Sequence, residues 1–165
     1  MKNIPEFISE AVKNEPDYSK SFSQKVAALA QDIKELSNLE NIHSESMDYC
    51  PAQYIEIKLN NQASNSPRVN FEVRFYISSK ADLFFIYIND KTGKTKNHHV
   101  ISHPLPTSIL PEAVQGIILK IKNFLIERSY REVAYDFYDQ EAVDCLTQMD
   151  GLRANIFEAL FAEIV

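Results

Sequence analysis

The chain has 165 residues, of which 45% are hydrophobic and 24% charged, values typical of one globular domain and not of a disordered chain. Its longest apolar run, residues 83–88, is far shorter than the roughly 20 residues that span a bilayer, and its acidic first ten residues lack the apolar stretch of a signal peptide. The chain has only three glycines, which almost excludes a glycine-rich phosphate-binding loop. Its two cysteines, Cys50 and Cys145, are widely spaced, so we expect a reduced, cytoplasmic protein.

The net charge of −6 is concentrated in residues 132–150. Outside this segment 17 acidic residues balance the 17 basic ones, because six of the 23 carboxylates lie inside it and no Lys or Arg does. The six are Glu132, Asp136, Asp139, Glu141, Asp144 and Asp150, and the aromatic residues beside them are Tyr130, Tyr135, Phe137 and Tyr138. This composition disfavours nucleic acid, whose phosphates require Lys and Arg, and favours a basic protein partner. The alternative is a solvated face whose aromatic residues enter the core.

Apolar spacing predicts two helices near the N-terminus. Residues 5–13 form the first, with apolar side chains on one side. Residues 21–36 form the second, because a capping-box pattern at Ser21 is followed by apolar residues at alternating spacings of four and three. Residues 38–51 are expected to form a loop.

The apolar period then changes to two, which predicts strands at residues 53–59, 69–77, 82–89 and 95–102. The unbroken apolar run in the third strand indicates cover on both faces and a central place in the sheet. Short connections favour an antiparallel four-strand meander. Its edge strands would be 53–59 and 95–102.

The remaining chain predicts three helices. The first follows the prolines at 104–111 and contains Gly116, which we expect to mark a close approach to the sheet. The second covers residues 135–152, although residues 133–137 also alternate and could form a fifth strand. The third follows the break at residues 150–151. The predicted fold is α+β: a single domain over residues 1–165, with a four-strand antiparallel meander flanked by N-terminal helices and three C-terminal helices.

No residue pattern predicts enzymatic chemistry. The sequence at residues 93–95 lacks the earlier glycine and the following helix of a phosphate-binding loop. His98 and His99 would point to opposite faces of a strand, and His103 would lie about 13 Å from His99, so these residues form no metal site. Neither cysteine has the neighbouring histidine and acid of a nucleophile. We therefore expect no catalytic residue, no cofactor and no metal.

The size, acidic charge and layout of the whole chain resemble those of the immunity proteins of bacterial toxin systems, particularly contact-dependent growth inhibition, without a shared motif. The resemblance implies a cytoplasmic inhibitor that binds one cognate toxin, often a basic nuclease, and covers its active site. In at least one such group the toxin adds a β-hairpin to the immunity protein's sheet. The alternatives are an acidic secretion chaperone, or an enzyme whose site assembles only in three dimensions.

Two candidate partner-binding surfaces follow. The first is the acidic segment, in which carboxylates would steer a basic toxin and tyrosines would anchor it; its residues are Asp136, Asp139, Glu141, Asp144, Tyr135 and Tyr138. The second is the predicted edge strand 53–59, with Tyr54, Glu56 and Lys58, which could accept a strand from the partner. We prefer it to the edge at 95–102, whose lysines and histidines would repel a basic toxin. We expect no nucleic-acid or membrane partner, and the oligomeric state is left open.

Overall fold

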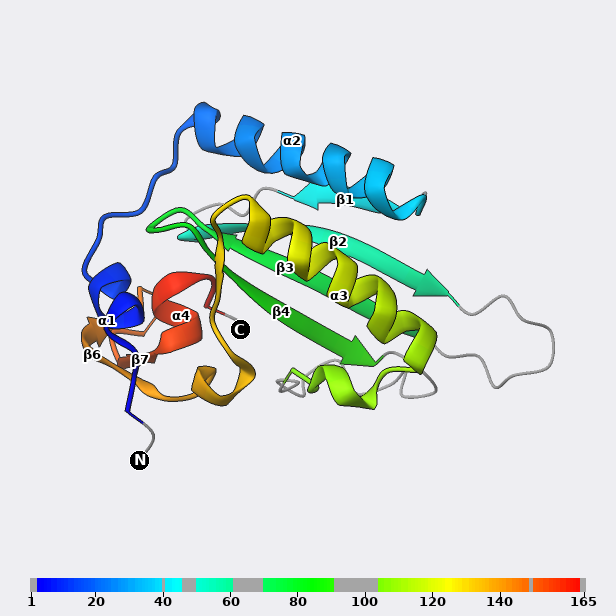
Figure 1. Cartoon of the computed structure of the whole chain (residues 1–165). Coiled ribbons are helices and arrows are strands. Elements are labelled where there is room, and N and C mark those ends of the chain that lie inside the picture. The colour runs from blue at the N-terminus through cyan, green and yellow to red at the C-terminus, as the bar shows by residue number, and fades with distance from the viewer. Residues whose placement is uncertain are drawn as a thin grey trace.

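A five-stranded sheet in the order β1–β2–β3–β4–β5 forms the centre of the protein (Figure 1). The computed structural model describes residues 3–39, 41–45, 50–60, 70–90, 104–148 and 150–163. Neighbouring strands from β1 to β4 are antiparallel, and β5 runs parallel to β4. The strands are β1 Ile42–Glu45, β2 Ala52–Asn60, β3 Asn70–Ser78, β4 Leu83–Asp90 and β5 Arg131–Glu132.

Two long helices cover one face of this sheet. They are α2 (Lys20–Ser37) and α3 (Glu112–Glu127), and the 3-10 turn η1 (Thr107–Ile109) precedes α3. Their inward side chains join alternate residues of the strands in one apolar core; the helices contribute Phe22, Val26, Leu29, Ala30, Ile33, Ile118, Ile121 and Leu125. In Figure 1 α3 lies in front of the sheet and α2 lies along the side of β1.

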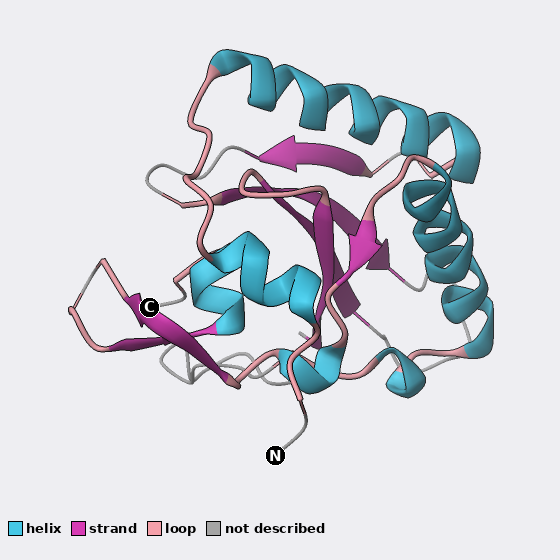
Figure 2. Cartoon of the chain, turned by 60° about the vertical axis from the view of Figure 1, so that its left-hand side comes forward, coloured by secondary structure: helices cyan, strands magenta, loops and turns pink. Residues whose placement is uncertain are grey.

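The opposite face carries the N-terminal and C-terminal elements, so that the sheet lies between two layers (Figure 2). These elements are α1 (Glu6–Val12), the 3-10 turn η2 (Tyr135–Phe137), the two-stranded sheet of β6 (Glu141–Leu146) and β7 (Arg153–Asn155), and α4 (Ile156–Leu160). They form a second core with the other set of strand residues, including Tyr76, Leu83, Phe85 and Tyr87. Cover on both faces explains the unbroken apolar run of β4, as predicted.

The sequence patterns of the N-terminal helices are confirmed, with one correction. α1 and α2 fall where the spacing predicts them. The cap of α2 is Ser19 and not Ser21: its hydroxyl accepts a hydrogen bond from the Phe22 amide at 3.3 Å. The helix ends where Asn38 adopts a left-handed conformation, with φ of 56°.

Three of the predicted strands are found as β2, β3 and β4, but the predicted loop at 38–51 contains β1. This strand has one buried residue, Ile42, and so little apolar alternation that the sequence could not reveal it. Because β1 pairs with β2 from Ile42↔Ile57 to Glu45↔Tyr54, the prediction that 53–59 is an edge strand is wrong. The predicted strand at 95–102 lies outside the described residues.

The prediction of a helix over residues 135–152 is also wrong. This segment forms η2 and then β6, and the alternative strand at 133–137 is replaced by β5, which ends at Glu132. Pairing between β6 and β7 shifts from Glu141↔Asn155 to Leu146↔Arg153. Such a bulge interrupts strict alternation, which is why the buried positions of the segment resemble a helical spacing.

The helices after the prolines differ from prediction in detail. α3 occurs as expected, but Gly116 is exposed, and a Cβ added there would have no atom within 4 Å. It therefore does not mark a close approach to the sheet. The last helix, α4, ends at Leu160 and is shorter than the apolar pattern indicated.

Candidate protein-binding site

One aromatic side chain lies at the centre of the contact between the C-terminal elements and the sheet. Phe157 of α4 is 1% exposed, and its ring centre lies 4.9 Å from that of Tyr138, 5.1 Å from that of Tyr76 and 5.2 Å from that of Phe85. Tilted and edge-on ring pairs at these distances are favourable beyond the area that they bury. The positions of η2, β6 and β7 therefore depend on the packing of Phe157.

Hydrogen bonds fix the chain on both sides of this aromatic contact. The amide of Ile156 donates to the carbonyl of Gln140 at 2.8 Å, and the amide of Phe157 donates to the carbonyl of Tyr138 at 3.3 Å. A capping box starts α4: the side chain of Asn155 accepts from the Glu158 amide at 2.8 Å, and the Glu158 carboxylate accepts from the Asn155 amide at 2.9 Å. Glu158 is thus a structural carboxylate.

The hairpin of β6 and β7 exposes large apolar side chains. Val143 is 70% exposed, Leu146 67% and Leu152 65%, the three highest values among the large hydrophobic residues described. Asp144 has a φ of 61°, a left-handed conformation that costs a non-glycine residue about 1 kcal/mol. It lies within the irregular stretch of β6, so the bulge coincides with the exposure of Val143 and Leu146.

The same segment of the chain carries five exposed carboxylates. Asp136, Asp139, Glu141, Asp144 and Asp150 are all exposed. Glu141 pairs with Arg153 at 3.0 Å. Hydrogen bonds from the Thr147 hydroxyl and the Leu152 amide lower the pKa of Asp150, which keeps this group charged. We call the surface formed by η2, β6, β7 and their connecting residues 135–155 the acidic hairpin.

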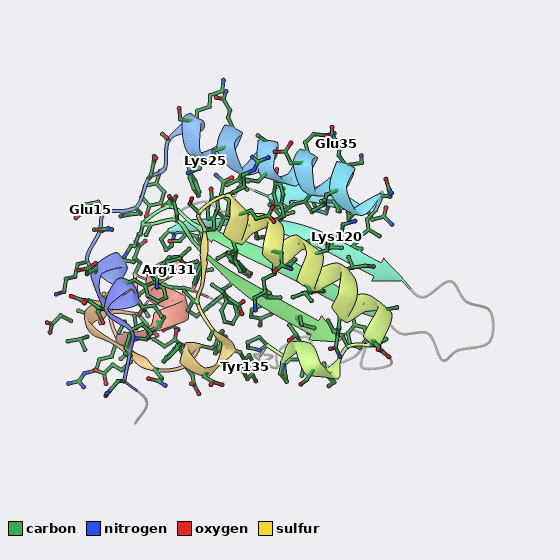
Figure 3. All side chains as sticks on the ribbon, in the orientation of Figure 1. Glu15, Lys25, Glu35, Lys120, Arg131 and Tyr135 are labelled. Atoms are coloured by element: carbon green, nitrogen blue, oxygen red, sulfur yellow. The ribbon has the colours of Figure 1, made fainter. Side chains whose placement is uncertain are left out.

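The two predicted tyrosine anchors differ in their surroundings. Tyr135 is 43% exposed and lies on η2 (Figure 3). Tyr138 is buried at 8% exposure in the core with Phe85, Tyr87 and Phe157. Burial raises the pKa of Tyr138 well above its ordinary value, with smaller contributions from Tyr87 and Glu158. Its position indicates a role in packing the acidic hairpin against the sheet.

The second predicted surface lies inside the sheet. Glu56 of β2 stands between His43 of β1 and Arg74 of β3 in the pairing register. Glu56 is buried, and its carboxylate lies 3.4 Å from the Nε2 atom of His43. Tyr54 is half-buried and Lys58 is exposed. By alternation, Tyr54, Glu56 and Lys58 share the sheet face of Tyr76, and Tyr54 packs against the core that Tyr76 forms with Tyr138 and Phe157.

Arg74 is the centre of this polar part of the sheet. Its guanidinium contacts the Glu72 carboxylate at 2.8 Å, donates to the Tyr76 hydroxyl at 3.2 Å and lies over the ring of Tyr54. Burial alone would lower the pKa of Arg74, but the Tyr76 and Glu72 contacts raise it above its ordinary value. The arginine is therefore permanently charged. Its two terminal nitrogens are engaged within its own sheet, whereas its buried Nε atom has no hydrogen-bond partner among the described residues. This arrangement favours a structural ion network over a catalytic site.

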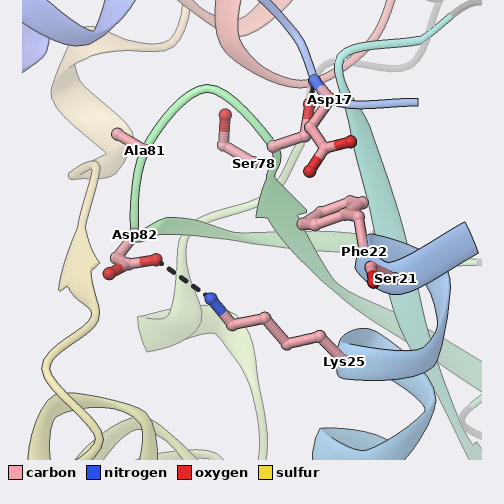
Figure 4. Close-up of a pocket in the computed structure, with 8 residues that line it drawn as sticks. Asp17, Ser21, Phe22, Lys25, Ser78, Ala81 and Asp82 are labelled. Carbon is pink, nitrogen blue, oxygen red and sulfur yellow. Dashed lines mark hydrogen bonds and ion pairs between the residues drawn. The ribbon is translucent and has the colours of Figure 1, made fainter. Parts of the chain in front are cut away.

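A small pocket of about 200 Å³ lies between the start of α2 and the turn from β3 to β4 (Figure 4). Its charged groups are already paired: Lys25 contacts Asp82 at 3.3 Å, and Asp17 accepts from the Ser19 amide at 2.8 Å. Ligand sites usually have volumes of about 300 Å³ or more, so this pocket is a weak candidate for a small-molecule site.

Metal-ligand clusters and membrane-spanning helices are both absent from the described residues. Within them, no three His, Cys, Asp or Glu side chains converge as metal ligands; His98, His99 and His103 lie outside them. Of the helices in the same residues, none has the length and apolar character needed to cross a membrane. Comparison with known proteins adds no relative: no family model, no curated protein and no solved structure matches the chain.

Sequence reasoning identified the carboxylates of the acidic hairpin but missed its apolar residues. The helix predicted over residues 135–152 includes Leu152 in its apolar spacing. Val143 and Leu146 do not fit that spacing, and this misfit is the signal that the sequence offers. Two apolar residues outside the predicted core face, among carboxylates, indicate an exposed apolar surface.

Proposed function

We propose that this chain is a protein-binding module, not an enzyme, and that its acidic hairpin binds a basic protein partner. In its most specific form the proposal is a cytoplasmic immunity protein that neutralises a cognate, nuclease-like toxin by covering the toxin's active site. The observation that carries the proposal is the combination of Val143, Leu146 and Leu152, each at least 65% exposed, with exposed carboxylates in the same segment of the chain.

The two kinds of side chain would act at different stages of binding. Protein interfaces usually have an apolar centre and a polar rim, and a few large side chains in the centre supply most of the affinity. Rim charges mainly accelerate association with a partner of opposite charge. The acidic hairpin has both parts, since its apolar residues lie on β6 and next to β7 and its carboxylates extend back to Asp136 on η2.

The bulge at Asp144 affects which side chains of β6 are exposed. A regular strand would turn every second residue of β6 towards α1 and α4, as Ala142 is turned now. Backbone conformations of higher energy concentrate at functional sites. Contacts that the exposed side chains make with a partner would offset the energy of this conformation. An exposed apolar patch of this kind is typical of a protein-binding surface.

The test compares two variants as bait in a pull-down from the host cell. The hairpin variant carries Val143→Thr, Leu146→Thr and Leu152→Thr, which replace apolar side chains with a β-branched polar residue that strands tolerate well. The control removes three exposed apolar side chains elsewhere, by Ile109→Thr, Leu119→Gln and Ile126→Gln. We expect a basic protein that the parent and the control retain and the hairpin variant loses.

Inhibition separates an immunity protein from other binding proteins. The retained partner is purified, and its catalytic activity is measured with and without an equimolar amount of the parent chain. Loss of activity with the parent, and its return with the hairpin variant, is expected of an immunity protein. An acidic partner, or a partner that all three baits retain equally, would contradict binding through the acidic hairpin. A bound partner with full activity would contradict the immunity role.

A further inference from the structure

The outward side of α3 contains a glycine for which the chain offers no packing reason. Gly116 is exposed in the middle of the helix, and a Cβ added there meets no atom within 4 Å. Glycine in a helix costs about 1 kcal/mol relative to alanine. Close packing of another molecule against α3 at this position would explain why it carries no side chain.

Exposed apolar residues surround Gly116. Leu119 is 55% exposed and Ile126 47%, and Ile109, in the turn that leads into α3, is 50% exposed. Ala113, Gly116, Leu119, Asn123 and Ile126 recur at spacings of three and four residues, so they form one continuous stripe. This stripe faces away from the buried residues Ile118, Ile121 and Leu125.

We propose that α3 packs antiparallel against α3 of a second copy of this chain, around a two-fold axis next to Gly116. In such an isologous contact, residues equally distant from the axis in the two copies face each other. Ala113 then faces Leu119, and Ile109 lies opposite the end of the helix that carries Asn123 and Ile126. Two glycines at the crossing point let the helix axes approach to about 8 Å, the short end of the usual range.

The charged residues of α3 favour a second copy of the chain as the partner, and they define how the two helices are aligned. Glu112 and Lys120 are exposed, and no ion pair within the described part of the chain engages either of them. They are eight residues apart, about 12 Å along one helix, too far to pair within a single copy. The axis at Gly116 brings Glu112 of each copy next to Lys120 of the other, whereas an axis at the middle of α3 would oppose Glu112 to Glu127, a repulsive pair.

The test measures self-association by sedimentation equilibrium, over about 1 µM to 1 mM of the full chain. We expect a concentration-dependent dimer. Glu112→Lys alone and Lys120→Glu alone should each raise the dimer dissociation constant about tenfold or more, and the double variant should restore it to within about threefold. Because the two residues do not touch within one copy, restoration can arise only between copies.

Two further variants separate the interface from folding and from other surfaces. Gly116→Leu should abolish the dimer without lowering the melting temperature, because the position is exposed and an added Cβ meets no atom in the monomer. Leu152→Gln, on the acidic hairpin, should leave the dimer unchanged. A chain that stays monomeric to about 1 mM, a double charge reversal that restores nothing, or a dimer that Leu152→Gln dissociates and Gly116→Leu does not, would overturn the proposal.

Discussion

The guanidinium of Arg74 lies over the ring of Tyr54 on the neighbouring strand, 4.4 Å from the ring centre. The two residues are diagonal neighbours on one face of the sheet, since Arg74 is opposite Glu56 and Tyr54 is opposite Tyr76. An arginine stacked on an aromatic ring keeps its charge while its flat surface leaves water. The contact links β2 to β3 where the sheet carries buried carboxylates.

Loss of the Arg74 charge should destabilise the protein. Arg74→Met keeps most of the stem but leaves the buried Glu72 carboxylate without its guanidinium contact. We expect the free energy of unfolding to fall by about 2–3 kcal/mol, slightly less than for a fully buried pair, because Arg74 is partly exposed. Urea denaturation measures the change. Arg153→Met, which breaks an exposed ion pair, should cost less than about 0.5 kcal/mol, and an equal loss in both variants would contradict the structural role of Arg74.

Truncation of Phe157 should release the C-terminal elements from the sheet. Phe157→Ala removes a fully buried ring and is expected to cost about 3–5 kcal/mol of unfolding free energy, whereas Phe157→Leu, which refills most of the volume, should cost less. Hydrogen exchange of the amides in β6 should increase more than that of the amides in β2. Uniform acceleration over both strands would show that the acidic hairpin does not depend on Phe157.

Alkaline pH should destabilise the fold through its buried tyrosines. Burial raises the pKa of Tyr138, and also that of Tyr76 and Tyr54. In the unfolded chain a tyrosine ionises near pH 10, whereas in the folded chain it keeps its proton to higher pH. The stabilisation is therefore complete below pH 10 and is lost as the pH rises above it.

The unfolding free energy should accordingly fall above about pH 10, with each such tyrosine contributing up to about 1.4 kcal/mol per pH unit. Tyr138→Phe should make this fall shallower, and Tyr18→Phe, at an exposed position, should not. Denaturation at a series of pH values between 8 and 11 gives both slopes. Identical slopes in the two variants would mean that Tyr138 is accessible to water.

Two glycines should respond in opposite directions to the same substitution. Gly116→Ala should raise the unfolding free energy by about 1 kcal/mol at concentrations where the chain is monomeric, because the helix favours alanine and the added methyl meets nothing. Gly151 has a φ of 69°, so Gly151→Ala should lower it by about 1 kcal/mol. Thermal melting at low protein concentration compares the two, and a loss of stability in Gly116→Ala would be the contrary result.

Much of the fold could be predicted from the sequence, because period and burial coincide in most of it. α1, α2 and α3 have one apolar side each, and β2 and β3 alternate regularly. β1 escaped prediction because a strand with a single buried residue has no period. Its absence from the predicted sheet made β2 an edge strand and suggested, wrongly, that Tyr54, Glu56 and Lys58 border a free edge.

The acidic hairpin could be predicted in charge but not in shape. Six carboxylates without a basic residue are visible in the sequence, and no three-dimensional information is needed to find them. The left-handed conformation of Asp144 and the shifted pairing of β6 have no signature in the local sequence. The bulge changes the alternation so that Cys145 packs against the core and Leu146 is exposed, whereas Val143 is exposed by ordinary alternation with buried Ala142.

The most direct test of the central claim is the association rate between this chain and the basic partner that it retains. The variant Asp136→Asn, Asp139→Asn and Asp144→Asn leaves the Glu141–Arg153 pair intact, and asparagine tolerates the backbone conformation of Asp144. The matched control, Glu15→Gln, Glu35→Gln and Glu127→Gln, removes the same charge at other exposed positions. Rates are compared at about 50 mM and about 300 mM salt, since screening shortens the range of these charges.

At the lower salt concentration we predict that the hairpin variant associates about tenfold more slowly than the parent, and that its rate depends less on salt, while its dissociation rate changes little. The control should associate within about twofold of the parent, because charges far from the contact steer the partner weakly. Equal association rates and equal salt dependence in the parent and both variants would contradict the claim that the acidic hairpin binds the partner.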